Sequence, residues 1–438
     1  MPTVAFYTLG CKVNQHDSFS LMQAFGDAGF AVLDPEQSAD AYIVNSCTVT
    51  AAGEKKSLQA LRRFRRQAPG AVVVLCGCFP QAFPEKAGGI PQADIVMGSK
   101  NRAALVSAVL DKLAGKSGRL VDIPAHTQDE PFEQAGALPL SHRTRAFLKI
   151  QDGCERRCAY CIVPKARGPV RSKPPRDIRE ELENLARAGY KEAVLTGINL
   201  SCYGQDLGLT LSDAIETSCR TPGLSRIRLG SLEPDLITDE DISRWTRFRQ
   251  DRWQGAALCD HFHLCLQSGC DRTLESMNRR YGAEYYRQTA DKLRAAFPGC
   301  AITTDIMVGF PGESDDDHQA SKAFVRQMGF ARAHVFIYSP RPGTPAADMP
   351  GRVPPKIASQ RAKEMADTVN ESRAAFLRTR LGGAYPVLFE SEQDGLCHGH
   401  TPCYTPVWAR SSGDICGEIL PVRLTQLHED GCLGEIAP

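Results

Sequence analysis

The chain has 438 residues, of which 42% are hydrophobic and 24% charged, which suits a globular protein of about three domains. No segment approaches the roughly 18 consecutive apolar residues of a membrane span, and the N-terminus does not resemble a signal peptide, so we expect a cytoplasmic protein without membrane contacts. Seventeen cysteines, an odd number, argue against a secreted disulfide framework and favour thiolates that bind metal. The net charge of +1 leaves any nucleic-acid affinity to local patches.

The first 115 residues alternate between strand and helix patterns. The run at 71–76 is nearly pure Val and Leu and predicts a buried parallel strand. The alternation predicts an open, doubly wound α/β domain over 1–115, and the following Gly, Pro and Ser residues predict a linker over 116–140. The predicted strands are 3–9, 41–45, 71–76 and 94–97, and the predicted helices are 17–28, 53–67 and 101–113.

A second series of strands and helices begins near residue 146. Six strand patterns separated by helices predict an incomplete (β/α)6 barrel over 141–375. A long helix is predicted over 356–381, and Val/Leu runs broken by Gly, Pro and Asp predict a small β-barrel over 376–438. The predicted barrel strands are 146–151, 193–197, 226–230, 262–266, 301–307 and 333–338, with helices at 177–188, 213–219 and 283–296.

Three cysteines follow three strands of the first domain at matched offsets. Cys11, Cys47 and Cys78, which we call the strand-end trio, each come about two residues after a predicted parallel strand. Carboxyl ends of such strands converge on one crevice, so the trio could hold one metal cluster. The alternative is three buried structural cysteines, a common state for this residue type. Cys76 competes with Cys78 but is predicted to pack inward from its strand.

Cys154, Cys158 and Cys161 form a second set, the loop trio, with the spacing Cys-x3-Cys-x2-Cys. They follow the first barrel strand, so we expect them at the mouth where barrel active sites lie. A structural zinc site needs four ligands, whereas an iron–sulfur cube held by three cysteines leaves one iron open. A zinc site completed by a distant His261 or Cys265 is the alternative.

The loop trio, in which Tyr160 precedes the last cysteine, resembles that of the radical S-adenosylmethionine (SAM) enzymes. Both trios together, with TLGCKVNQ at 8–15, NSCTVT at 45–50 and CGC at 76–78, resemble the methylthiotransferases over essentially the whole chain. The resemblance implies an N-terminal methylthiotransferase domain, a radical SAM barrel and a C-terminal TRAM β-barrel. The opening TLGCKVNQ is similar to that of the branch acting on N6-threonylcarbamoyladenosine at position 37 of tRNA.

The resemblance also implies two [4Fe–4S] clusters. The loop trio would hold the cluster that binds SAM and, once reduced, cleaves it to methionine and a 5′-deoxyadenosyl radical. The strand-end trio would hold the cluster that presents sulfur to C2 of the adenine, and a second SAM would supply the methyl group. The C2–H bond is unactivated, so cofactors must carry this step. The implied partners are the tRNA anticodon loop with adenosine 37 and an electron donor such as flavodoxin or ferredoxin.

Several further positions lie at predicted strand ends, where family members bind SAM. Ordinary turn chemistry is the alternative for each of them, because Gly and Ser are frequent in such turns. Tyr160 is included because its ring could lie beside an adenine. The predicted cofactor-binding positions are Tyr160, Gly197, Asn199, Ser231, Glu233, Gln267 and Asp305.

Two groups of cations are predicted to contact RNA phosphates, with an affinity that falls steeply with salt. For the first group a solvated helix face is the alternative. The 384–438 segment carries Arg410 and Arg423 against eight acidic residues, a balance of −6, which predicts that the first two domains supply most of the RNA affinity. The predicted contacts are Lys55, Lys56, Arg62, Arg63, Arg65 and Arg66, and then Arg156, Arg157, Lys165 and Arg167, with Arg143, Arg145, Arg171 and Lys173 nearby.

The function predicted first is therefore methylthiolation of threonylcarbamoyladenosine-37 in tRNA. The alternatives are the same chemistry on isopentenyladenosine-37 or on a ribosomal protein. From another class, the chain could be a non-catalytic iron–sulfur redox or RNA-binding protein, which the large barrel argues against.

Overall fold

A computed structural model describes residues 1–116, 118–133 and 144–437. The chain divides into two compact units. The first comprises Met1–Leu138, Gln151–Lys173 and Ser339–Ala347, and the second comprises Pro139–Ile150, Pro174–Tyr338 and Asp348–Pro438. Arg143 and much of the predicted linker, at 117 and 134–140, lie outside the described residues. Among the helices described, none is both long and apolar enough to cross a bilayer.

A parallel sheet forms the centre of the first unit, as the sequence predicted. Its strand order is β2-β1-β3-β4-β5-β6. The short strands β2 and β6 had not been predicted, and β6 lies inside the segment predicted as a linker. The bounds are β1 Thr3–Thr8, β2 Ala31–Leu33, β3 Ala41–Ser46, β4 Val72–Gly77, β5 Ile95–Met97 and β6 Leu120–Asp122.

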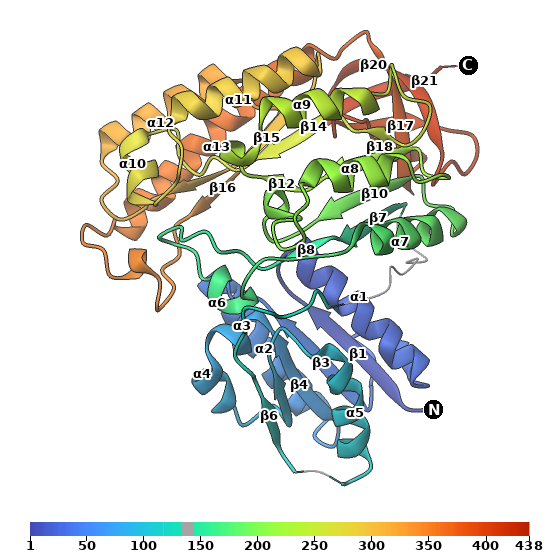
Figure 1. Cartoon of the computed structure of the whole chain (residues 1–438), viewed down its shortest axis with the longest axis vertical. Coiled ribbons are helices and arrows are strands. Elements are labelled where there is room, and N and C mark those ends of the chain that lie inside the picture. Colours follow the sequence, from blue (N-terminus) through green and yellow to red (C-terminus); the bar gives the residue numbers. More distant parts are fainter. Residues whose placement is uncertain (117, 134–143, 438) are drawn as a thin grey trace. The chain divides into compact units, whose positions relative to one another are not determined.

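Helices cover both faces of this sheet (Figure 1). Alternate strand residues point to opposite faces, so the sheet contributes to two apolar cores. Helices α1 (Lys12–Asp27) and α5 (Arg102–Leu113) pack on one face. Helices α2 (Ala51–Gln67), α3 (Cys78–Ala82) and α4 (Pro84–Gly88) supply the other core. Helix α1 begins five residues earlier than predicted, directly after Cys11.

The first unit also contains the loop trio. Strands β8 (Gln151–Asp152) and β9 (Arg171–Ser172) pair antiparallel, and helix α6 (Val163–Arg167) lies between them in sequence. Ile162 and Ala166 pack against Cys78 and Ala82 of α3. This apolar contact anchors the segment after the loop trio to the strand-end trio's side of the sheet.

Within 144–437, the barrel strands of the second unit form two parallel sheets, with orders β13-β11-β10-β7 and β12-β14-β15-β16. All six predicted barrel strands are confirmed, and the third of them, 226–230, corresponds to β11. After Gly230 the chain continues as β12, which was not predicted and belongs to the other sheet. The strands are β7 Arg145–Lys149, β10 Glu192–Thr196, β11 Arg226–Leu229, β12 Ser231–Leu232, β13 Ala257–Leu258, β14 His261–Leu264, β15 Ala301–Val308 and β16 Arg332–Ile337. The helices are α7 Pro175–Arg187, α8 Leu211–Cys219, α9 Asp239–Trp245, α10 Asp271–Ser276, α11 Ala283–Ala296 and α12 Asp315–Met328.

Helix α13 (Pro355–Arg378) leads into the predicted C-terminal β-barrel, which is confirmed. Its closed strand order is β17-β18-β19-β21-β20. Buried arginines of β11 connect it to the partial barrel: Arg226 donates to the carbonyl of Pro386 at 2.7 Å, and Arg228 to that of Pro402 at 2.7 Å. The strands are β17 Ala384–Gln393, β18 Leu396–His400, β19 Pro406–Arg410, β20 Ile419–His428 and β21 Gly431–Ile436.

Candidate catalytic centre with two cysteine trios

The strand-end trio lies at the carboxyl ends of three neighbouring strands. Cys11 follows β1 and caps α1, Cys47 follows β3, and Cys78 opens α3 directly after β4. Burial raises the pKa of the Cys78 thiol to about 12, and the charges of Cys11 and Cys47 contribute to the rise. Cys76 packs in the apolar core, which confirms that it points inward. The sheet therefore brings together the three cysteines that the sequence predicted.

Asn14, which the sequence analysis did not single out, connects the three loops of this trio. Its Nδ2 donates to the carbonyl of Leu9 at 2.8 Å and to that of Ser46 at 2.9 Å. Its Oδ1 lies 3.4 Å from the Cys78 thiol. Gly10, with φ of +108°, allows the loops to close, because a Cβ there would lie 3.0 Å from that of Cys47.

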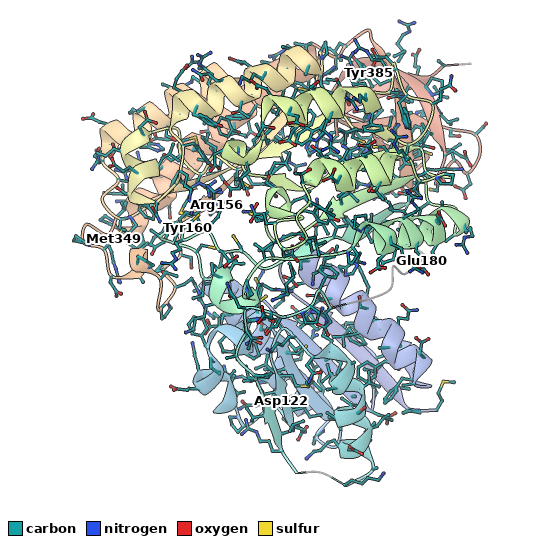
Figure 2. All side chains as sticks on the ribbon, viewed as in Figure 1. Asp122, Arg156, Tyr160, Glu180, Met349 and Tyr385 are labelled. Atoms are coloured by element: carbon teal, nitrogen blue, oxygen red, sulfur yellow. The ribbon has the colours of Figure 1, made fainter. Side chains whose placement is uncertain are left out.

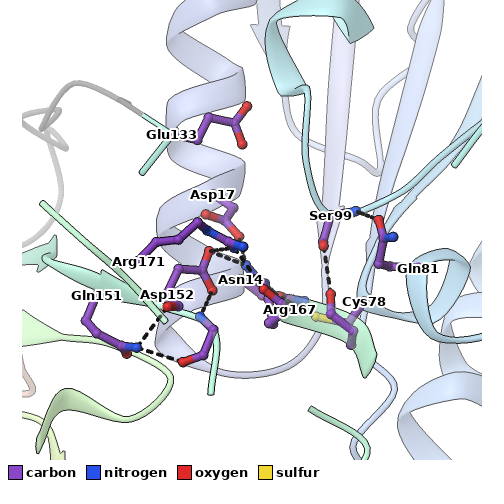
Figure 3. A network of polar contacts seen from close by, with 12 residues as sticks. Asn14, Asp17, Cys78, Gln81, Ser99, Glu133, Gln151, Asp152, Arg167 and Arg171 are labelled. Atoms are coloured by element: carbon purple, nitrogen blue, oxygen red, sulfur yellow. Dashed lines mark hydrogen bonds and ion pairs between the residues drawn. The ribbon is translucent and has the colours of Figure 1, made fainter. Parts of the chain in front are cut away.

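Arg167 contacts the same trio from the segment that follows the loop trio (Figure 3). Its Nε donates to Cys78 Sγ at 3.2 Å, and its Nη1 donates to Asp17 at 2.7 Å and Asp152 at 3.3 Å. Its Nη2 also donates to Asn14. Burial would lower the pKa of Arg167, but Cys78, Asp17 and Asp152 raise it well above its ordinary value, so the guanidinium stays charged.

The loop trio is held by a tight backbone. Gly153 has φ of +75°, and a Cβ there would lie 1.7 Å from the Pro169 carbonyl oxygen, so only glycine fits. The amide of Cys154 donates to the carbonyl of Gly168 at 3.0 Å, and that of Cys161 to Cys158 at 3.0 Å. Two further side chains of this loop, Arg156 and Tyr160, are marked in Figure 2. Here Arg156 is buried, whereas Tyr160 is partly exposed.

The spacing of both trios fits a multi-iron cluster better than a single zinc ion. With Zn–S bonds of about 2.3 Å, the sulfur atoms of a zinc site lie at most ~4.6 Å apart. Among the described residues, the trio whose ligand atoms all lie within 4.8 Å of one another is His263, Cys265 and Asp305. Neither cysteine trio in the described part of the chain meets that spacing. Three thiolates are, by contrast, a donor set that suits a [4Fe–4S] cube with one open iron.

The proposed partners of a zinc alternative have other neighbours in the second unit. His261 Nε2 lies 3.0 Å from Thr303 Oγ1, a hydrogen-bond distance. Cys265 belongs to the compact group just described with His263 and Asp305. His261 thus has a hydrogen-bond neighbour of its own, while Cys265 belongs to a group within the second unit that could itself hold a metal ion.

Most of the predicted cofactor-binding residues of the second unit lie at or just after strand ends, whereas Asp305 lies inside β15. Gln267 shows the strongest local signal, with φ of +72° and a buried Oε1 that has no hydrogen-bond partner among the described residues. Strain and an unsatisfied polar atom together suit a residue that meets a ligand. The others are Gly197 and Asn199 after β10, Ser231 on β12, Glu233 directly after β12, and Asp305 on β15.

The two carboxylates in this set, Glu233 and Asp305, each have an arginine or histidine neighbour. Glu233 Oε2 lies 2.5 Å from Arg279 Nη2, so it forms a buried ion pair in this structure. Asp305 lies 3.4 Å from His263 Nε2. Burial would raise the pKa of Asp305, but the His263 hydrogen bond lowers it below its ordinary value. Arg279 and His263 were not predicted from the sequence.

Some of the cations that the sequence predicted as RNA contacts are buried in the structure. Arg167 is only 1% exposed and bonded on all sides, so it is not available to phosphate. Arg156 is also buried, and Arg65 donates to the carbonyls of Pro69, Ala71 and Gln92. Lys55 and Arg62 are exposed and line a cavity of about 600 Å³ with Lys86, Phe83 and Arg341. The exposed members of the predicted set are Lys55, Lys56, Arg62, Arg66, Arg157 and Lys165.

Comparisons with known proteins agree with these observations. Residues 3–98 match the family described as uncharacterized protein family UPF0004, and residues 148–325 match the radical SAM superfamily. The chain is similar to the threonylcarbamoyladenosine tRNA methylthiotransferase MtaB of Bacillus subtilis, with 36% identity over 97% of this chain and 94% of the relative. The protein of that name from Thermotoga maritima is also 36% identical, over 99% and 96%.

A relative with another substrate is nearly as similar. The tRNA-2-methylthio-N(6)-dimethylallyladenosine synthase of Akkermansia muciniphila is 33% identical over 97% of both chains. Among solved structures, the radical SAM methyltransferase TsrM of Kitasatospora setae aligns with a TM-score of 0.57 and 16% identity, over 79% of this chain and 75% of its own. At that identity the likeness concerns the fold alone.

Proposed function

Because this chain belongs to the radical SAM methylthiotransferase family, we propose that it methylthiolates C2 of N6-threonylcarbamoyladenosine at position 37 of tRNA. The presence of both cysteine trios in one compact unit is the observation that carries the proposal. The names of two relatives at 36% identity support the choice of nucleoside. The dimethylallyladenosine relative at 33% makes that nucleoside the second candidate.

The loop trio would hold one [4Fe–4S] cluster and the strand-end trio the other. Bound SAM with a reduced cluster supplies radical chemistry, and a second cluster supplies sulfur. Gly153 gives the loop trio its tight turn, while Asn14 holds the three loops of the strand-end trio together. Gln267 remains a candidate SAM-binding residue of the second unit, because its buried amide oxygen has no hydrogen-bond partner among the described residues. A small electron carrier such as flavodoxin or ferredoxin would deliver the electron in the cytoplasm.

The substrate is tested by mass spectrometry of tRNA nucleosides from a strain that lacks the gene. The 2-methylthio group should disappear from threonylcarbamoyladenosine and remain on other methylthiolated nucleosides. Complementation with the unaltered gene should restore it, whereas a Cys158→Ala gene should not. Loss from the dimethylallyl nucleoside instead would establish the second candidate.

Exposed cations of α2 should contribute to tRNA binding. We expect the double charge reversal Lys55→Glu with Arg62→Glu to weaken binding at least tenfold. It should also reduce the slope of log K against log salt by about 1.4 to 1.8, since each lost phosphate contact removes ~0.7–0.9. Fluorescence anisotropy with labelled tRNA at several salt concentrations measures both quantities.

The matched control for this prediction is Lys112→Glu with Lys116→Glu. It makes the same change in net charge, at and just after the end of α5, the helix that packs on the other face of the sheet. Equal weakening by both double variants would show that overall charge, rather than the α2 surface, governs tRNA affinity.

A further inference from the structure

The buried guanidinium of Arg167 donates toward a single cysteine of the strand-end trio. Its Nε lies 3.2 Å from Cys78 Sγ, and its two other nitrogens are fixed by Asp17, Asp152 and Asn14 (Figure 3). A planar guanidinium held at all three nitrogens cannot turn away from the sulfur without breaking several charge-assisted bonds. The hydrogen bond to Cys78 is therefore a fixed part of this site.

The two carboxylates that contact Arg167 also contact two other arginines. Asp17 is shared with a second cation, Arg102, whose Nη1 lies 3.3 Å from Asp17 Oδ1. Asp152 is likewise shared, because Arg171 Nη2 lies 3.8 Å from its Oδ2. Arg102 and Arg171 also have carboxylates of their own, Glu133 at 2.7 Å and Glu130 at 3.0 Å. Arg167 therefore keeps Asp17 and Asp152 as counter-ions, and it acts on the sulfur through the short Nε–H···Sγ bond in a buried site.

We propose that Arg167 is a positioning residue that raises the reduction potential of the cluster held by the strand-end trio. The inference rests on the proposed function for the presence of that cluster. One-electron reduction adds one negative charge to the cluster and breaks no bond, and a low-potential reductant such as dithionite supplies the electron. A hydrogen bond and a positive charge at a ligating sulfur stabilise the more negative, reduced form.

Arg167 also connects the two trios through covalent structure and hydrogen bonds. It ends α6, six residues after Cys161, and its Nη1 reaches Asp152, two residues before Cys154. The same side chain thus fixes the start of the loop trio's segment and a sulfur of the other trio.

The test compares full-length proteins in which the loop trio is replaced by alanine, so that one cluster remains. In this background, Arg167→Gln should lower the midpoint potential by at least 59 mV, a tenfold change in a one-electron equilibrium. The matched control is Arg102→Gln, which removes a buried cation from the same Asp17 while leaving the bond to Cys78 intact. The control should shift the potential by less than half as much.

Potentials are measured by dithionite titration followed by electron paramagnetic resonance, with iron counted in every variant. An unchanged potential in Arg167→Gln, or an equal shift in Arg102→Gln, would overturn the inference. About four irons per chain in the background protein are required by the proposed function. A lower count would overturn the cluster assignment itself, so the two failures are distinguishable.

If Arg167→Gln does not take up iron, a second measurement tests the hydrogen bond between Arg167 and the cluster directly. The background protein and its Arg102→Gln variant are labelled with ¹⁵N-arginine and reduced. Pulsed electron paramagnetic resonance should detect a ¹⁵N nucleus coupled to the cluster in both proteins, because the Nε–H···Sγ bond transmits spin density from the cluster to the arginine. Absence of the coupling in either protein would contradict a hydrogen bond from Arg167 to the cluster.

Discussion

Replacing Cys158 with alanine should abolish reductive cleavage of SAM, whereas replacing Cys47 should leave cleavage largely intact and stop methylthiolation of tRNA. The reason is the separation of the donor sets: Cys158 belongs to the turn that ends at Cys161, and Cys47 follows β3 of the sheet. Each cluster needs its own three thiolates. The readouts are 5′-deoxyadenosine formed with dithionite as reductant, methylthiolated nucleoside, and iron per chain.

Cys76→Ala is the matched control, because Cys76 lies two residues from Cys78 but packs in the apolar core. It should lose only packing energy and keep both activities and the full iron content. Loss of SAM cleavage in both Cys158→Ala and Cys47→Ala, with the loop trio's cluster still loaded in the latter, would contradict this division of labour.

Glu192→Gln should destabilise the second unit by about 3–5 kcal/mol, the usual effect of breaking a buried ion pair from one side. Glu192 is fully buried on β10 and accepts from Arg228 at 2.6 and 3.1 Å, with Arg226 at 3.6 Å. Its loss leaves two buried guanidiniums without their carboxylate. The chain's three tryptophans, at 245, 253 and 408, all lie in the second unit, so their fluorescence during urea unfolding reports on this unit.

The control for this prediction is Glu216→Gln, which breaks a partly exposed pair with Arg220 and Arg244. It should cost less than about 1 kcal/mol. Equal destabilisation by the two variants would show that the buried ion pair contributes no more to the free energy of unfolding than the exposed one.

Acidification should reproduce the effect of Glu192→Gln. Burial alone would raise the pKa of Glu192, but Arg228 and Arg226 lower it from 4.5 to about 2. A depressed carboxyl pKa gives stability that is complete above the ordinary value and is lost as the pH falls toward the folded value. The difference in unfolding free energy between the unaltered chain and Glu192→Gln should therefore be constant above about pH 5 and narrow below pH 4.5.

Local patterns predicted most of the fold because strands such as β3, β4 and β10 are largely apolar and each is followed by a helix. The edge strands β2 and β6 were missed because each has three residues that are at least partly exposed, whereas the equally short β5 is a fully buried apolar run. The two-residue strand β12 after Gly230 was also missed, since nothing in the sequence shows that the chain passes there from one sheet to the other. The predicted domain boundaries stay predictions.

The six cysteines could be predicted because their offsets from strands and their mutual spacing are local features. Arg167 and Asn14 could not, because their contacts join residues 89 and 153 positions apart. The sequence offered Arg167 as one cation in a basic stretch, which suggested a surface role. Burial reversed that interpretation, just as it separated Arg65 from the exposed Arg62 on the same helix.

The first unit is assembled from three separate stretches of chain. A fragment that contains only the first stretch therefore lacks contacts that the full chain makes. A fragment that stops before residue 151 would expose the apolar side of Cys78 and Ala82 and leave Asp17 without Arg167. It would also lack Arg341, the partner of Glu54. A separate amino-terminal sheet would thus keep its two apolar cores but lose the contacts that tie it to the later parts of the chain, which makes it a less self-contained piece than its continuous strand order suggests.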